Sequence, residues 1–115
     1  MSIQATCHCG DVVCTVDLEP TEALSCNCSI CRRKGQLLAF TTPDRFDLET
    51  SREALTVYTF GAHKIRHNFC KRCGCAPFGE GVSPDGKSMV AINLRCVPEL
   101  DLATIRRREF DGASL

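Results

Sequence analysis

The chain has 115 residues, a balanced formal charge and ten cysteines, and its length predicts one domain over residues 1–115. Fourteen lysines and arginines match fourteen aspartates and glutamates, which argues against binding to nucleic acid or an acidic membrane surface. No apolar run reaches the roughly 18 residues that span a bilayer, and the N-terminal residues lack the pattern of a secretory signal. We therefore expect a cytoplasmic protein with neither nucleic acid nor membrane as a partner.

Hydrophobic residues make up 43% of the chain, but that figure includes the ten cysteines. Without them the apolar share falls to roughly a third, which is low for a domain that must bury about two thirds of its surface. Closely spaced cysteines in a reducing compartment bind metal more often than they form disulfides. The composition thus predicts a small domain stabilised by metal.

Short apolar runs separated by turn signals dominate the chain. They predict strands at 3–7, 11–16, 36–42, 55–60, 64–69 and 89–94. Helical turns are predicted at 29–34, at 51–54 after a Ser51 cap, and at 101–107. Many short strands and almost no long helix predict a mainly β fold, and the stacking of its sheets stays open.

Eight of the ten cysteines fall into three groups with metal-ligand spacing. The groups are a C-x-C at Cys7 and Cys9, a C-x-C-x2-C at Cys26, Cys28 and Cys31, and a C-x2-C-x-C at Cys70, Cys73 and Cys75. In an extended segment, residues i and i+2 project to the same side, so a C-x-C can offer both thiolates to one ion. A C-x2-C must turn back around the ion, and Gly74 supplies the backbone freedom for that turn.

The three groups can be combined in more than one way. Zinc binds four thiolates in closed structural sites and three in sites that keep an open position. One arrangement joins Cys7 and Cys9 to Cys70 and Cys73, which closes a loop of about sixty residues and leaves the middle cluster with a free position. Another makes the third cluster a three-ligand set, with Cys7 and Cys9 joining the middle cluster. The spacing alone does not choose between them.

Three cations, Arg32, Arg33 and Lys34, directly follow Cys31. Positive charge beside thiolates favours the ionised sulfur and could hold a small anion at the open position. The simpler interpretation of each cation is a solvated helical turn, but we expect at least one of the three to contact a ligand. The middle cluster is therefore the better candidate for a functional site.

These motifs resemble the glutathione-dependent formaldehyde-activating enzymes, a family that also contains centromere protein V. The matching features are Cys7-x-Cys9-Gly10, Cys26-Asn27-Cys28-Ser29-x-Cys31-Arg32-Arg33, Gly35 and His67-x-Phe69-Cys70-x2-Cys73-Gly74. Their order and separations agree with the family, and the similarity covers about residues 5–110. Cys75 departs from the family pattern, which has no required ligand at that position.

The resemblance implies a β-tent fold, in which short antiparallel sheets with few helical turns are pinned by two zinc ions per chain. The structural zinc of the family is held by residues that correspond here to Cys7, Cys9, Cys70 and Cys73. The second, catalytic zinc is held by residues that correspond here to Cys26, Cys28 and Cys31. The family thereby selects the first of the two arrangements.

The implied activity is the addition of glutathione to formaldehyde or a related small aldehyde, which gives S-(hydroxymethyl)glutathione and is classed as a carbon–sulfur lyase reaction. We expect the glutathione sulfur to take the open position, because a zinc with three thiolates is suited to holding a fourth as a nucleophile. The carboxylates of glutathione need cationic partners, and Arg32, Arg33 and Lys34 are the nearest in sequence. Alternatives are a non-catalytic glutathione carrier and a zinc-stabilised protein-binding module.

No side chain stands out as a general base. His8 lies between two expected ligands and is predicted to be exposed, and His63 follows a turn at the surface. His67 alternates in phase with Ile65 and Phe69, which favours a hydrogen-bonded core position over catalysis.

The remaining cysteines and cations have simpler interpretations. Cys14 and Cys96 lie in apolar segments and are predicted to be small buried hydrophobic residues. The basic run at 106–108 is diluted by nearby acids and predicted to be a solvated face. The cysteine count also permits an iron–sulfur protein, which would be coloured, and a thiol–disulfide switch at the middle cluster.

Overall fold

The structure, a computed structural model, describes residues 2–114 and is mainly β, as predicted. Its strands are β1 (Ser2–Thr6), β2 (Val13–Asp17), β3 (Glu22–Cys26), β4 (Leu38–Thr41), β5 (Phe46–Leu48), β6 (Leu55–Tyr58), β7 (Arg66–Cys70), β8 (Phe78–Val82), β9 (Ser88–Asn93) and β10 (Arg106–Phe110). Helix α1 (Ser29–Lys34) matches its predicted range, and short 3₁₀ turns lie at Pro43–Arg45, Arg52–Ala54, Leu94–Cys96, Leu102–Thr104 and Gly112–Ser114. Among residues 2–114, no helix is long and apolar enough to cross a membrane.

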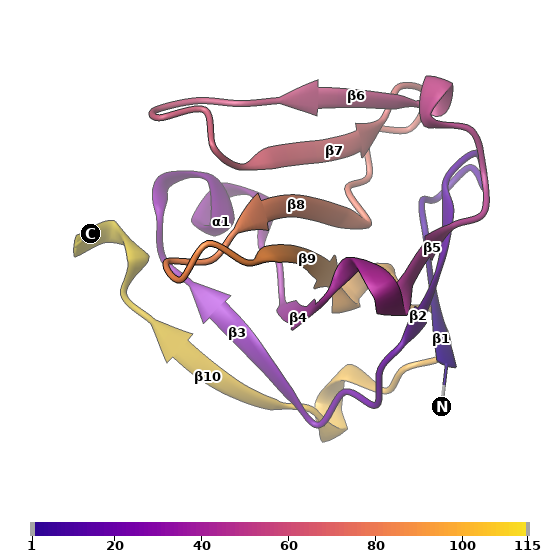
Figure 1. The fold of residues 1–115 in the computed structure, drawn as a ribbon. Helices are drawn as coiled ribbons and strands as arrows, with labels where there is room; N and C mark the ends of the chain where they lie inside the picture. The colour runs from indigo at the N-terminus through magenta and orange to yellow at the C-terminus, as the bar shows by residue number, and fades with distance from the viewer. Residues whose placement is uncertain (1, 115) are drawn as a thin grey trace.

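The strands form two sheets (Figure 1). A small sheet has the order β1-β2-β5, and a large one has the order β10-β3-β4-β9-β8-β7-β6. The large sheet runs from β6 and β7 at the top of Figure 1 to β3 and β10 at the bottom, with the small sheet at one side. All the neighbouring pairs are antiparallel except β3 and β10, which run parallel. The predicted antiparallel sheets are thus present, with one parallel pair at the edge of the large sheet.

Four of these strands, β3, β5, β8 and β10, are not predicted by the sequence pattern. Strand β8 reads Phe-Gly-Glu-Gly-Val, and its two glycines hide the alternation of a strand. The predicted helical turn at 101–107 is confined to Leu102–Thr104, after which the charged segment Arg106–Phe110 continues as β10. That segment is exposed throughout, as expected for the basic run, and its backbone pairs with β3 at the sheet edge.

The core lies between the two sheets. Alternate residues of the small sheet, such as Ala5 and Val16, are fully buried in one core cluster with Phe78 and Ile92 of the large sheet. Burial of this apolar surface favours folding by about 25 cal/mol per Å². The Ser51 hydroxyl caps the turn before β6 by accepting from the Glu53 amide, as predicted.

The large sheet has a second face that carries the site. In one row across four strands, His67 pairs with Gly79, Gly79 with Ala91, and Ala91 with Phe40. Because side chains alternate between faces along a strand, this row lies opposite the face that buries Phe78 in the core. Helix α1 follows β3 at one end of that row.

Candidate metal centres

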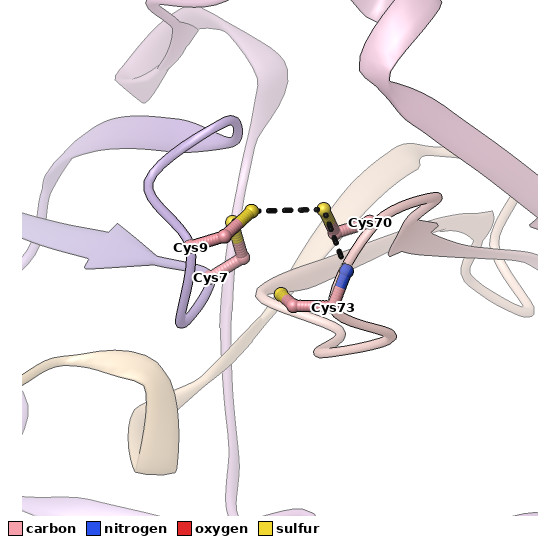
Figure 2. Close-up of side chains that lie close together, drawn as sticks. All are labelled: Cys7, Cys9, Cys70 and Cys73. Carbon is pink, nitrogen blue, oxygen red and sulfur yellow. Dashed lines mark hydrogen bonds between the residues drawn. The ribbon is translucent and has the colours of Figure 1, made fainter.

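Four sulfurs from two distant segments meet in one cluster. Cys7 and Cys9 follow β1, Cys70 ends β7, and Cys73 lies in the turn after it (Figure 2). All four Sγ atoms lie within 4.8 Å of one another. The Sγ of Cys9 is 3.6 Å from those of Cys7 and Cys70, across a separation of 61 residues in the second pair. The first of the two arrangements is therefore the one that brings these cysteines together.

The distances within this cluster fit a tetrahedral ion. Four sulfurs at about 2.3 Å from zinc lie about 3.8 Å apart, close to the observed 3.6 Å. A disulfide would need about 2.05 Å, and all four cysteines are free thiols. The residues present thus match the requirements of a closed four-thiolate site.

The local backbone shapes this cluster as a metal knuckle. The amide of Val12 donates to the Sγ of Cys7 at 3.2 Å, and the amide of Arg72 donates to the Sγ of Cys70 at 3.4 Å. Gly74 has a φ of 79°, a conformation that side chains disfavour, and its amide donates to the carbonyl of Cys70 at 2.9 Å. Backbone donors aimed at sulfur stabilise thiolates.

The crowded sulfurs also perturb one another. Donors from the backbone, the Cys75 amide first, lower the pKa of Cys73 to about 5. The Asp11 amide lowers the pKa of Cys9, but burial and the three neighbouring sulfurs outweigh it and raise that pKa to about 12. Like charges in one place disfavour full ionisation, and a divalent cation would relieve that repulsion.

A second cluster forms where β3 passes into α1. Cys26 ends β3, Cys28 is the N-cap residue of α1, and Cys31 lies within the helix. Their three Sγ atoms also lie within 4.8 Å of one another. The amide of Cys28 donates to the Sγ of Cys26 at 3.4 Å, and Gln36 Nε2 donates to the Sγ of Cys31 at 3.7 Å. The described residues thus place three cysteine sulfurs where they could bind one metal ion.

The pKa values of Cys28 and Cys31 are perturbed by their surroundings. Burial raises the pKa of Cys28, but backbone amides, that of Cys31 first, and the neighbouring sulfurs outweigh it, so its pKa lies below the ordinary value. Burial is also the main reason that the pKa of Cys31 rises to about 12, with Cys28 and Cys26 adding to it. The pKa values of Cys28 and Cys31 thus shift in opposite directions.

The C-terminal segment closes one side of the second cluster, a feature that no sequence pattern indicates. Asn27, between two of the cysteines, donates from Nδ2 to Asp111 at 2.9 Å and accepts at Oδ1 from the Ala113 amide at 3.0 Å. A Cβ atom placed on Gly112 would lie 2.5 Å from the Sγ of Cys26. Only a residue without a side chain fits there.

The other three cysteines belong to neither cluster. Cys14 is fully buried, as predicted, and burial raises its pKa to about 12. Cys96 is only half-buried, so the prediction of a buried residue is wrong for it, because it ends a 3₁₀ turn at the margin of the core. Cys75 is also half-buried and packs against the core. The structure therefore does not support a ligand set of Cys70, Cys73 and Cys75.

The two clusters differ in whether they line a cavity. Cys26, Cys28 and Cys31 line a cavity of 580 Å³ that extends over the large sheet. A neighbouring cavity of 450 Å³ is lined by Arg33 and Lys34, and Ile30 and Phe60 line both. The four cysteines of the first cluster are not among the residues that line either cavity.

The three cations after Cys31 are exposed, as a solvated turn would be. Arg33 donates from Nη1 to the Ser29 carbonyl at 2.7 Å, and the Lys34 ammonium lies 5.5 Å from the centre of the Phe69 ring. Arg32 does not line either cavity. Arg33 and Lys34 therefore line the cavity that neighbours the one lined by the second cluster.

The prediction for His67 is wrong. It is half-buried rather than a core residue, stacks on Phe60 at 5.5 Å between ring centres, and lines the larger cavity with the three cysteines. His67 does alternate in step with Ile65 and Phe69, but the side of the sheet that they share is the partly exposed one and not the core side. Burial lowers the pKa of His67, and the charge of Lys34 lowers it further. His8 and His63 are exposed, as predicted.

The protein is thus a small β domain with two candidate metal centres. One is a four-cysteine set that joins distant segments, and the other is a three-cysteine set that lines a cavity. The chain belongs to the family of glutathione-dependent formaldehyde-activating enzymes, whose family model matches residues 2–108. The resemblance seen in the sequence is thereby confirmed. The chain is also similar to a protein from Rhodobacter sphaeroides of known crystal structure, with 26% identity and a TM-score of 0.78 over 92% of this chain and 100% of that one.

Proposed function

We propose that this protein is a carbon–sulfur lyase of its family, which adds glutathione to formaldehyde or a related small aldehyde and holds two zinc ions. One observation carries the proposal: the three-cysteine cluster lines a cavity, whereas no residue of the four-cysteine cluster lines that cavity or its neighbour. A closed four-thiolate set stabilises a fold, and a three-ligand set keeps a position for a substrate.

The two cysteine sets would hold the ions in different roles. Cys7, Cys9, Cys70 and Cys73 would hold the structural zinc, and Cys26, Cys28 and Cys31 would hold the catalytic one. When bound at the second set, zinc supplies a Lewis acid that keeps a substrate thiol ionised at neutral pH. A cytoplasmic location is part of the proposal, because all ten cysteines are free thiols that a reducing compartment would preserve.

The chain's own residues would bind and orient glutathione. Arg33 and Lys34 border the cavity next to the three cysteines, and their charges match the two carboxylates of the tripeptide. The contact of Lys34 with Phe69 holds one ammonium in place. Arg32 lines neither cavity, so we expect it to contribute less to glutathione binding than Arg33 and Lys34 do. Holding both reactants in one cavity would supply acceleration by proximity.

The reaction itself needs no co-reactant. The glutathione sulfur forms a bond to the aldehyde carbon, the carbon–oxygen double bond becomes single, and the thiol proton ends on the new hydroxyl. Because this addition is chemically easy, binding and orientation are the contributions expected of the chain.

A calorimetric titration of reduced glutathione into protein whose zinc content has been counted tests the proposal. We expect saturable binding at one site per chain and at least about tenfold weaker binding of S-methylglutathione, whose methylated sulfur cannot form a thiolate. Equal affinity for the two compounds would show that sulfur plays no part. A protein with two zinc ions that binds neither compound at millimolar concentration would refute the glutathione chemistry.

A further inference from the structure

The cavity beside the three cysteines is far larger and more apolar than formaldehyde requires. Its volume is 580 Å³, within the range of ligand pockets. Formaldehyde has two heavy atoms and would occupy roughly a tenth of it, if each atom takes about the 30 Å³ of a water molecule. Formaldehyde would therefore leave most of the space to glutathione or to a larger part of the aldehyde.

The hollow is built by small residues at the centre of the large sheet. Gly79 lies between His67 and Ala91 in the same row of paired residues, and Phe40 follows Ala91 on the next strand. All four residues line the cavity. Two neighbouring positions with little or no side chain, between ring side chains on either side, leave a trough on the sheet. The trough therefore results from the small side chains at Gly79 and Ala91 within one continuous sheet.

Exposed hydrophobic side chains gather around this trough. Five of the large hydrophobic residues that are at least 39% exposed also line it, namely Phe40, Phe60, Ile65, Val82 and Phe110. They come from several strands and loops that are far apart in sequence. A concentration of exposed apolar side chains around a concave site indicates that a ligand covers them.

Charge separates the two neighbouring cavities. Among the described residues, no lysine or arginine lines the larger cavity. Its one acidic residue, Glu80, is bonded to Arg52 at 3.1 Å and to Asn68 at 3.0 Å. The smaller cavity holds Arg33 and Lys34. The carboxylates of glutathione thus match the smaller cavity, and the larger one offers them no cation.

We propose that the aldehyde used by this protein carries an apolar substituent, a medium-length alkyl chain or an aryl ring, which lies in the trough over Gly79 and Ala91. This inference rests on the proposed function, because the three cysteines in the cavity wall would place the reacting sulfur at its edge. The sulfur–carbon bond forms there, the thiol proton passes to the aldehyde oxygen, and the product is a hemithioacetal whose apolar group points away from the cations.

The test is a binding series of S-methyl-, S-butyl- and S-hexylglutathione, which resemble the product and need no turnover. Burial of each added methylene should raise affinity about three- to fourfold until the trough is full. The protein is used with its zinc content counted. Ala91→Leu, whose side chain would extend over Gly79, should bring the ratio of S-hexyl to S-methyl affinity close to one. Ala103→Leu is the matched control, because Ala103 is exposed outside both cavities.

The outcomes separate this inference from the proposed function. A rise in affinity with chain length that Ala91→Leu removes and Ala103→Leu keeps supports the inference. Affinity that is flat with chain length overturns it, and it leaves the proposed function standing if reduced glutathione still binds better than S-methylglutathione. Sedimentation that shows a dimer broken by Ala91→Leu would also overturn it, because a second copy of the chain would then cover the trough.

Discussion

Gly112 lies against Cys26, so close that a Cβ atom on Gly112 would come within 2.5 Å of the Cys26 sulfur and 3.3 Å of the Cys28 Cβ. The C-terminal segment is fixed there by the bonds of Asn27 to Asp111 and to the Ala113 amide. Residues 109–114 lie beyond the family match, which ends at residue 108. The segment therefore forms a wall of the second cluster that the family pattern does not include.

Gly112→Ala should prevent the second cluster from binding a metal ion. The new methyl group must displace the Cys26 sulfur or move the segment, and either change spoils a three-ligand site. We expect the zinc content to fall from two ions to one per chain, measured by a colorimetric zinc assay after gel filtration. Gly81→Ala is the control, because its Cβ would meet Ile65 Cγ1 at an ordinary 3.5 Å. Two ions retained in Gly112→Ala would contradict the assigned wall.

The two clusters should differ in their effect on stability. Cys70→Ser removes a ligand from the four-cysteine site, which connects segments 61 residues apart. Cys28→Ser removes a ligand from the three-cysteine site, whose members lie within a few residues of one another at the junction of β3 and α1. Cross-links over longer loops restrict the unfolded chain more, and structural zinc sites contribute folding energy directly. We expect Cys70→Ser to lower the free energy of unfolding in urea by several kcal/mol, on the order of 3–5, and Cys28→Ser by about 1. A larger loss of unfolding free energy in Cys28→Ser than in Cys70→Ser would contradict the assignment of the structural site to the four-cysteine cluster.

The cations should contribute unequally to glutathione binding. Arg33 and Lys34 line the smaller cavity, and Arg32 does not. We expect Arg33→Ala and Lys34→Ala each to weaken binding of reduced glutathione about threefold to fivefold, the upper part of the range of an exposed ion pair. Arg32→Ala serves as the matched comparison and should change the dissociation constant by less than about twofold. A larger loss of glutathione affinity in Arg32→Ala than in the other two variants would contradict the assignment of the carboxylates to the smaller cavity.

Glu80 should make stability depend on pH. Burial raises the pKa of this carboxyl group, but hydrogen bonds from Arg52 and Asn68 outweigh it and hold the pKa below its ordinary 4.5. A lowered carboxyl pKa stabilises the fold above the unfolded value, and this stabilisation disappears as the pH falls through the folded pKa. Glu80→Gln should thus reduce the free energy of unfolding by about 1–2 kcal/mol at neutral pH.

The comparison of wild type and Glu80→Gln as a function of pH isolates that contribution, because both proteins would lose zinc in acid alike. The difference between them, measured by urea unfolding, should shrink as the pH falls below 4.5. A difference that stays constant or grows in acid would show that Glu80 acts through packing and not through its charge.

The grouping of the cysteines could be predicted from the sequence more fully than the arrangement of the strands. Cysteine spacing is local, so Cys26, Cys28 and Cys31 are recognisable as one set without any structure. The partner of Cys7 and Cys9 depends on which strands meet 61 residues apart, and only the resemblance to a family could select it. Spacing could not, because both arrangements satisfy the same ligand count.

The errors have a common physical origin. His67 and Ile65 share a period of two with the core strands, but sequence periodicity does not say which face of a sheet is covered. Gly79 has the sequence character of a strand breaker and is instead the base of the trough, where the missing side chain makes room. Gly112 has meaning only through a contact with Cys26, distant in sequence, which no local pattern can encode.

The proposed function depends above all on the three-cysteine cluster receiving a thiol. Titration of reduced glutathione into the wild type and into Cys28→Ser, each with its zinc counted, is the decisive measurement. We predict one saturable site per chain in the wild type and no measurable binding in Cys28→Ser, which should retain its fold and the ion of the four-cysteine cluster. Equal affinity in both proteins would refute this role of the cluster and place any glutathione site elsewhere.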